Sequence, residues 1–331
     1  MSPRPRADAP VPADSTPSAH SGSAPAAVPG PAAVPVRRGR PRLSPGRIVA
    51  WGVMAAIVLI TLLPFYWIAR TALSSNTALT TDPANPLPVD FGWGGFERVF
   101  GLQSTEEALA QGGAGGSLNF WRYLLNSTFV AALMTVCQLL FSAMAAYAFA
   151  RLRWRGRNQV FGLFLAGLMV PALFTLLPNF VLIKQLGLVD TLLGIALPTM
   201  FMTPFAVFFL RQFFMNLPRE LEEAALLDGA GKIRIFFRLA LPMASAPMAT
   251  LGVLTYITAW NDYFWPLMVS YSDSSRVLTV ALSVFRSQTP QTGTDWSGLM
   301  AATLVAALPT LVLFGVFARR IVNSIGFSGL K

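Results

Sequence analysis

The sequence predicts an all-α polytopic membrane protein, and three observations support this. Hydrophobic residues make up 54% of the 331 residues and charged residues only 12%, whereas soluble domains are about 25% charged. The apolar residues fall in six runs, each long enough to cross a bilayer as a helix. Lys and Arg lie just outside these runs, as topology signals do.

The chain begins with a segment of different composition. Residues 1–46 are rich in Pro, Ala and Ser, carry no aromatic residue, and end in a basic cluster from Arg37 to Arg42. We expect a disordered cytoplasmic tail, because such a composition cannot bury an apolar core. Residues 47–331 are expected to form one six-helix domain.

Each apolar run is read as a helix, because an isolated strand cannot satisfy its backbone hydrogen bonds in lipid. The expected transmembrane spans are about 48–71, 124–150, 159–183, 191–212, 242–269 and 298–318.

The distribution of positive charge predicts the orientation. Most of the 25 Lys and Arg residues lie in the tail, in the turn 151–157, in the loop 213–241 and after the last span. Cytoplasmic segments carry the excess of Lys and Arg. Both termini and the loop 213–241 are therefore expected in the cytoplasm.

Composition also argues against several other functions. The net charge of +10 would suit nucleic-acid binding, but the topology of the spans already explains where the basic residues lie, so no nucleic-acid partner is expected. Cys137 is the only cysteine and His20 the only histidine. An internal disulfide is impossible, and neither a metal site nor His-based catalysis is expected in the membrane domain.

The cytoplasmic loop 213–241 has the pattern of two short helices. Its first half combines strong helix formers with an acidic first turn, which the helix dipole favours. A Gly-containing turn follows, and then a second amphipathic stretch, Ile233 to Leu241. Small alanines leave a low surface on which another protein can pack closely, as when a helix enters a groove.

This loop resembles the signature loop of bacterial ABC-importer permeases. In that family the loop forms the coupling helices that dock into the ATPase subunit, so the resemblance implies the same role here. The residues that carry the match are Glu223, Ala224, Ala225, Asp228, Gly229, Ala230, Phe236 and Pro242.

A second run, from Trp260 to Leu267, is similar to the W-N-D/E-x-x-W-P run of carbohydrate permeases. Together the matches cover about 47–331 and resemble the second permease subunit of maltose-type importers. The resemblance implies a multi-pass protein of the bacterial cytoplasmic membrane that forms half of the path for a sugar or oligosaccharide. The implied partners are a second permease, two ATPase subunits and an extracytoplasmic solute-binding protein, with membrane lipid around them.

Four residues of this run are candidates for the translocation path. Asn261 and Asp262 either line the path or hold two helices together by hydrogen bonds. Trp260 and Trp265 either stack on a sugar ring or serve as packing residues. In maltose-type importers the sugar contacts lie mainly on the partner permease, and the resemblance therefore weakens the case for a sugar site on this chain.

The chain itself is not expected to be an enzyme or to hold a metal or cofactor. Gly231 and Lys232 suggest a phosphate-binding loop, but Leu226 and Ile233 stand where that motif needs Gly and Ser or Thr. ATP and Mg²⁺ are therefore expected on the partner ATPase.

Other functions remain as alternatives. An importer for phosphate, a metal ion, a peptide or another solute would keep the class and change the cargo. A self-sufficient secondary transporter would need intramembrane acidic residues or inverted repeats, and neither is evident. A membrane enzyme would need a catalytic constellation beyond Asp262.

Overall fold

The computed structural model describes residues 45–113, 119–287 and 293–326. These residues form helices, with one isolated antiparallel bridge between Ser74 and Phe91. They divide into two units at Ala56 and Ile57, and the packing described below is that of the second unit. The predicted tail lies outside the described residues, apart from its last two, so its disorder stays a prediction.

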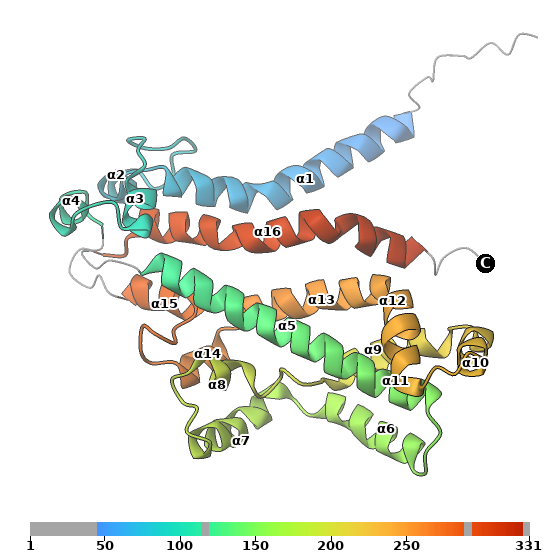
Figure 1. Cartoon of the computed structure of the whole chain (residues 1–331). Coiled ribbons are helices and arrows are strands. Elements are labelled where there is room, and N and C mark those ends of the chain that lie inside the picture. Colours follow the sequence, from blue (N-terminus) through green and yellow to red (C-terminus); the bar gives the residue numbers. More distant parts are fainter. Residues whose placement is uncertain (1–44, 114–118, 288–292, 327–331) are drawn as a thin grey trace, which may run out of the picture. The chain divides into compact units, whose positions relative to one another are not determined.

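Three long helices dominate the chain (Figure 1). They are α1 (Pro45–Ala72), α5 (Phe120–Arg151) and α16 (Trp296–Gly326). Helix α5 packs against α9 and α13, and α13 in turn packs against α16. The shorter helices are α2 (Asn76–Thr81), α3 (Gly94–Phe100), α4 (Thr105–Ala110), α6 (Arg157–Ala166), α7 (Ala172–Gln185), α8 (Leu192–Ala196), α9 (Pro204–Met215), α10 (Arg219–Leu227), α11 (Lys232–Ile235), α12 (Leu241–Met243), α13 (Ser245–Trp260), α14 (Phe264–Val269) and α15 (Leu278–Ser287), with a 3₁₀ turn η1 (Gly167–Met169) and a π-helical turn η2 (Phe236–Ala240).

The all-helical prediction is confirmed, whereas the six continuous spans are not. Among the described residues, α1, α5 and the part of α16 up to Phe317 are long and apolar enough to cross a membrane. Two further candidates are bent pairs: α6 with η1 and α7, bent by 102°, and α11–α12 with α13, bent by 76°. By length and composition the described residues therefore provide three spans, or up to five if each bent pair is one.

Proline explains two of the breaks. Pro171 precedes α7 at the sharp bend of the third expected span. In the fourth, α8 and α9 are separate helices, with Pro198 in the gap and Pro204 in the first turn of α9. Proline lacks an N–H and clashes with the preceding turn, so a helix ends before it more easily than it continues through it.

Sequence analysis assigned no helix to two segments outside the expected spans, and the structure has helices in both. Helices α2, α3 and α4 lie in the segment before α5, and α15 lies in the segment before α16. Helix α4 had a readable signal, because Ser104 and Glu107 form a reciprocal capping box. The backbone N–H and hydroxyl of Ser104 donate to the Glu107 carboxylate and hold its pKa below the usual value.

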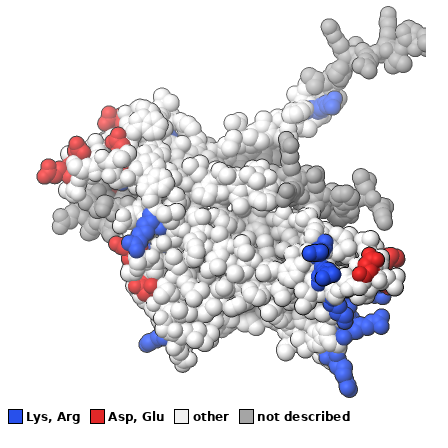
Figure 2. Space-filling model, viewed as in Figure 1, with Lys and Arg blue, Asp and Glu red and all other residues white. Residues whose placement is uncertain are grey.

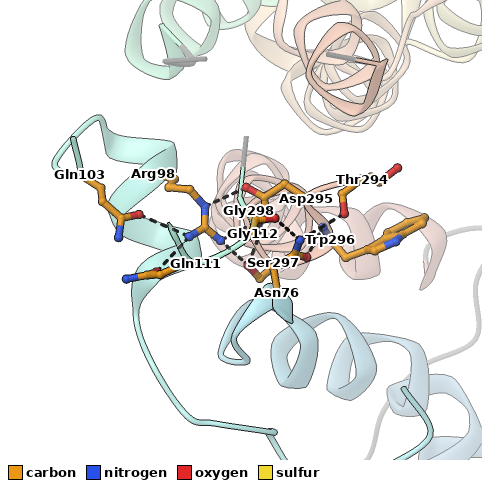
Figure 3. A network of polar contacts seen from close by, with 10 residues as sticks. All are labelled: Asn76, Arg98, Gln103, Gln111, Gly112, Thr294, Asp295, Trp296, Ser297 and Gly298. Atoms are coloured by element: carbon orange, nitrogen blue, oxygen red, sulfur yellow. Dashed lines mark hydrogen bonds and ion pairs between the residues drawn. The ribbon is translucent and has the colours of Figure 1, made fainter. Parts of the chain in front are cut away.

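A buried ion pair joins these early helices to the start of α16 (Figure 3). The guanidinium of Arg98 on α3 donates to both carboxylate oxygens of Asp295, at 2.8 and 3.1 Å. Both side chains are buried. Asp295 also accepts from the Gly298 N–H at 2.8 Å, so the same carboxylate caps α16.

Polar neighbours complete this network (Figure 3). Arg98 donates to the side-chain oxygens of Gln103 and Gln111, both at 3.3 Å. The Asn76 side chain accepts from the Trp296 N–H at 2.9 Å. Since a buried charge is costly unless it is paired and hydrogen-bonded, these partners stabilise the junction of α2, α3 and α16.

We expect Arg98→Met to lower the free energy of unfolding by about 3–5 kcal/mol, because it leaves the Asp295 carboxylate buried without its cation. Thermal unfolding of the purified protein in detergent measures the loss. Arg98→Met with Asp295→Asn should unfold at a higher temperature than Arg98→Met alone, since Asn is neutral and still caps the helix. An Arg98→Met midpoint equal to that of the wild type would contradict a stabilising role.

Candidate functional site

The first half of the predicted coupling loop is helix α10. Glu220 and Glu222 lie in its first turn, where the positive end of the helix dipole stabilises their negative charge. The helix exposes Glu223 and Ala224 and leaves Ala225 half-buried.

Helix α10 ends in a Schellman motif. Gly229 takes a left-handed conformation with φ of 79°. The Ala230 N–H donates to the Ala225 carbonyl at 2.9 Å, and the Gly229 N–H donates to the Leu226 carbonyl at 3.0 Å. This pattern satisfies the last carbonyls of the helix and fixes the direction in which the chain leaves it.

The second half of the loop turns back toward the helices of the bundle. Gly231 caps α11, and the helix continues through η2 into α12. Phe236 is buried and packs against the ring of Tyr147 on α5, with ring centroids 5.2 Å apart. Pro242, at the start of α12, is exposed.

Apolar side chains are exposed on this surface as well as polar ones. Leu227 is 90% exposed and Ile233 is 77% exposed, on either side of the Gly turn. Asp228 and Gly229 are also exposed. In Figure 2 basic side chains lie to the left of and below the acidic residues of α10 on this face. We call this surface, residues 219–238, the coupling surface.

One arginine joins the coupling surface to the long helix α5. Arg151, the last residue of α5, lies 3.3 Å from the Glu222 carboxylate and donates to the Leu217 carbonyl just before α10. The Arg151 and Glu222 side chains are 6% and 18% exposed, so this ion pair is largely shielded from water. This pair is a direct contact between α10 and the end of α5.

A groove with a volume of about 960 Å³ lies beside this ion pair. Its walls come from the turn after α5, the start of α6, α9 and α10. We call it the basic groove because five of its lining residues are arginines: Arg151, Arg153, Arg157, Arg211 and Arg219.

The two tryptophans among the expected path residues are buried. Trp260 is 5% exposed, and its indole N–H donates to the Ala306 carbonyl on α16 at 3.2 Å. Trp265 is 8% exposed and donates to the Ile195 carbonyl at 3.0 Å. Both indoles are buried with their polar atom bonded to backbone, which favours packing over stacking on a sugar.

Asn261 and Asp262 lie where α13 ends, rather than within a continuous span. The Asn261 amide is exposed and donates to the Ile257 carbonyl one turn earlier, at 2.9 Å. The Asp262 backbone carbonyl accepts from the Thr279 hydroxyl at 2.7 Å. Asp262 also lines a cavity, which Asn261 does not.

This cavity has a volume of about 600 Å³ and lies between α5, α7, α9 and α13. We call it the polar cavity because six of its lining residues are polar. They are Gln138, Thr199, Thr203, Thr255, Thr258 and Asp262. Sequence analysis missed all but Asp262, although a signal was present: polar side chains inside apolar runs usually face the interior of a membrane protein.

The coupling surface and the path residues are thus not brought together. They lie at opposite ends of α13: α12 leads into it at Ser245, and Asn261 follows its last residue.

One carboxylate accepts several hydrogen bonds from the segment after α14. Asp190 accepts from the N–H groups of Tyr271 and Ser272, at 2.8 and 2.9 Å, and from the Ser275 hydroxyl. Burial alone would raise the pKa of Asp190, but these hydrogen bonds hold it well below its usual value. The carboxylate is therefore ionised at neutral pH, and its stabilising effect is lost only as pH falls well into the acidic range.

Comparison with known families identifies the chain's class. Residues 138–326, which include the coupling surface and the polar cavity, match the family model described as the binding-protein-dependent transport system inner membrane component. The chain belongs to this family. It is therefore a permease-type component of the inner membrane.

Individual relatives of this transport family are similar over most of their length. The diacetylchitobiose uptake system permease protein of Streptomyces coelicolor is 30% identical over 86% of this chain and 86% of its own. The sn-glycerol-3-phosphate transport system permease protein of Yersinia pestis is 33% identical, covering 81% of this chain and 92% of its own. The arabinooligosaccharides transport system permease protein of Halalkalibacterium halodurans is 35% identical, covering 64% of this chain and 75% of its own.

A solved structure supports the permease fold. A chain of a bacterial ABC transporter involved in the import of the acidic polysaccharide alginate superposes with a TM-score of 0.68 and 23% identity. The match covers 85% of this chain and 99% of that chain.

We predict that substitution of the two glycines of the coupling surface, Gly229 and Gly231, has different effects on the local backbone. An added Cβ meets no atom within 4 Å at Gly229 or at Gly231, but only Gly229 has positive φ. A left-handed conformation costs an L-residue about 1–2 kcal/mol. Gly229→Ala should therefore speed hydrogen exchange of the backbone amides at positions 229 and 230. The matched control, Gly231→Ala, should not speed it. Equal exchange in the two variants would contradict the Schellman end.

Proposed function

We propose that this chain is a transmembrane permease subunit of a binding-protein-dependent ABC importer, forming half of the translocation path for a sugar or oligosaccharide. Separate ATPase subunits supply the energy and hold the ATP and Mg²⁺. The other partners are a second permease and an extracytoplasmic solute-binding protein. The observation that carries the proposal is the exposed coupling surface, which Arg151 and Glu222 join directly to α5.

The coupling surface suits a partner that displaces it through direct contact. Its helix ends are fixed by hydrogen bonds of the Gly turn, and its exposed Leu227 and Ile233 offer apolar contacts to a groove. A motion can be driven only by a partner that binds the two states of the permease with different affinity. We infer that the ATPase subunits provide this difference when they close on ATP.

The orientation follows from this assignment. The coupling surface lies in the cytoplasm, since the ATPase is there. Six spans with both termini inside agree with the distribution of Lys and Arg, with bent or broken helices serving as the third, fourth and fifth spans.

The polar cavity favours an uncharged cargo. Of its lining residues Asp262 alone is ionisable, and none is basic. A phosphate ester would be repelled by a carboxylate in a low-dielectric setting, whereas threonine hydroxyls and the Gln138 amide can exchange hydrogen bonds with sugar hydroxyls. Two of the relatives are named for oligosaccharide transport, which agrees with this choice. The relative named for glycerol phosphate keeps a non-sugar solute as the alternative.

The coupling assignment predicts that Glu223→Lys and Gly229→Pro each reduce uptake while the protein still inserts in the membrane. Loss of about 1–3 kcal/mol of coupling free energy corresponds to a roughly 5- to 150-fold effect. Uptake of radiolabelled oligosaccharide by cells is the measurement, with membrane abundance determined in parallel. Glu106→Lys on α4 makes the same charge change away from the coupling surface and should leave uptake unchanged. Unchanged uptake in both test variants would rule out the assignment.

The cargo assignment predicts that Thr258→Val raises the KM for uptake. The change is isosteric and removes a hydroxyl that lines the polar cavity, and one hydrogen bond is worth about 0.5–1.5 kcal/mol. Thr303→Val is the matched control, because both hydroxyls bond to a carbonyl of their own helix. Equal KM values for the two variants would argue that this cavity does not contact the cargo.

A further inference from the structure

The basic groove is lined by the acidic Glu222 and Glu223 as well as by its arginines, yet two of these arginines have no ion-pair partner in the part of the chain that the structure describes. Arg151 is paired with Glu222. Arg157 at the start of α6 and Arg211 on α9 line the same groove, and they lie close enough for their charges to repel each other. Among the residues that the structure describes, neither forms an ion pair with an acid.

Both guanidinium groups are nevertheless held in place. Arg211 lies over the ring of Phe161, with its guanidinium carbon 4.1 Å from the ring centroid, and its Nε donates to the Phe149 carbonyl at 3.4 Å. Arg157 donates from one Nη to the Leu152 carbonyl at 3.2 Å. Because a guanidinium has five N–H donors, each arginine keeps donors for a further acceptor.

Exposed apolar side chains adjoin the groove. Val160 and Leu163, one and two turns after Arg157 on α6, are 46% and 76% exposed. Trp154, which lines the groove, is 40% exposed. A tryptophan beside arginines, next to an exposed apolar helix face, is typical of the boundary between headgroups and acyl chains.

We propose that the basic groove binds the phosphate of an anionic phospholipid, with Arg157 and Arg211 as its principal partners and α6 beside its acyl chains. Arginine suits phosphate because its planar fork can donate two parallel hydrogen bonds. The inference rests on the orientation in the proposed function, which places the groove at the cytoplasmic leaflet. Anionic lipid attracts each basic residue near that surface by about 1 kcal/mol.

The position of the groove gives this lipid a functional consequence. Its walls include α10 and the last residues of α5, the two helices that the Arg151–Glu222 pair joins. A bound phosphate neutralises the repulsion between Arg157 and Arg211 and stabilises α6 against α9. The coupling surface is therefore expected to be more firmly held in a membrane that contains anionic lipid.

Native mass spectrometry of the full-length chain tests the proposal with three probes: phosphatidylglycerol, phosphatidylcholine of the same acyl chains, and inorganic phosphate. We expect wild-type protein to retain phosphatidylglycerol over phosphatidylcholine. Arg157→Gln with Arg211→Gln should weaken that retention by at least about tenfold, the equivalent of roughly 1.4 kcal/mol. Arg157→Lys with Arg211→Lys keeps both charges and should retain part of the binding.

The matched control is Arg122→Gln with Arg155→Gln, which removes the same net charge from residues that do not line the groove. Thermal unfolding of each variant verifies that it is folded. Equal loss of phosphatidylglycerol in the control and test variants would overturn the proposal, as would equal retention of the two lipids by the wild type. Displacement of phosphatidylglycerol by inorganic phosphate at similar concentration would identify a free-anion site and overturn the lipid assignment.

Discussion

The ion pair of Arg151 with Glu222 joins the coupling surface to the end of α5. Arg151 ends the longest described helix, α5, and binds both the Glu222 carboxylate and the Leu217 carbonyl. Without it, α10 would be joined to the bundle mainly through Phe236 and the start of α13. Removing one partner of a buried ion pair leaves an uncompensated charge and is strongly destabilising, so this pair stabilises the contact of α10 with α5.

The breaks in the helices border the polar cavity. Backbone that is not helical is tolerated at membrane depth only where it is buried in protein or lines a cavity. The breaks between α8 and α9, and between α13 and α14, both border the polar cavity, through Thr199, Thr203 and Asp262. The non-helical backbone at these breaks therefore lines a cavity, where it is least costly. The polar side chains of the cavity come from helices on several sides.

The sequence was sufficient for the class and for the helix and Gly turn of the loop 213–241, and insufficient for the polar cavity. The acidic start of α10 and the Gly turn are local signals, and the structure has both where the pattern placed them. The polar cavity depends on contacts between distant helices, such as the hydrogen bond from Gln138 to Thr203, which no local pattern encodes. Helix α15 was missed for a similar reason, because its buried face becomes apparent only once α5 and α16 pack against it.

The most direct test of the central claim is crosslinking from the coupling surface in the assembled importer. Ala224→Cys, in a Cys137→Ser background, places a single thiol on the exposed face of α10. A short thiol-to-amine crosslinker should join it to the ATPase subunit, with a yield that differs between the nucleotide-free and ATP-bound states. No crosslink to the ATPase in either state, in an importer that still takes up its cargo, would contradict the claim that α10 transmits the motion.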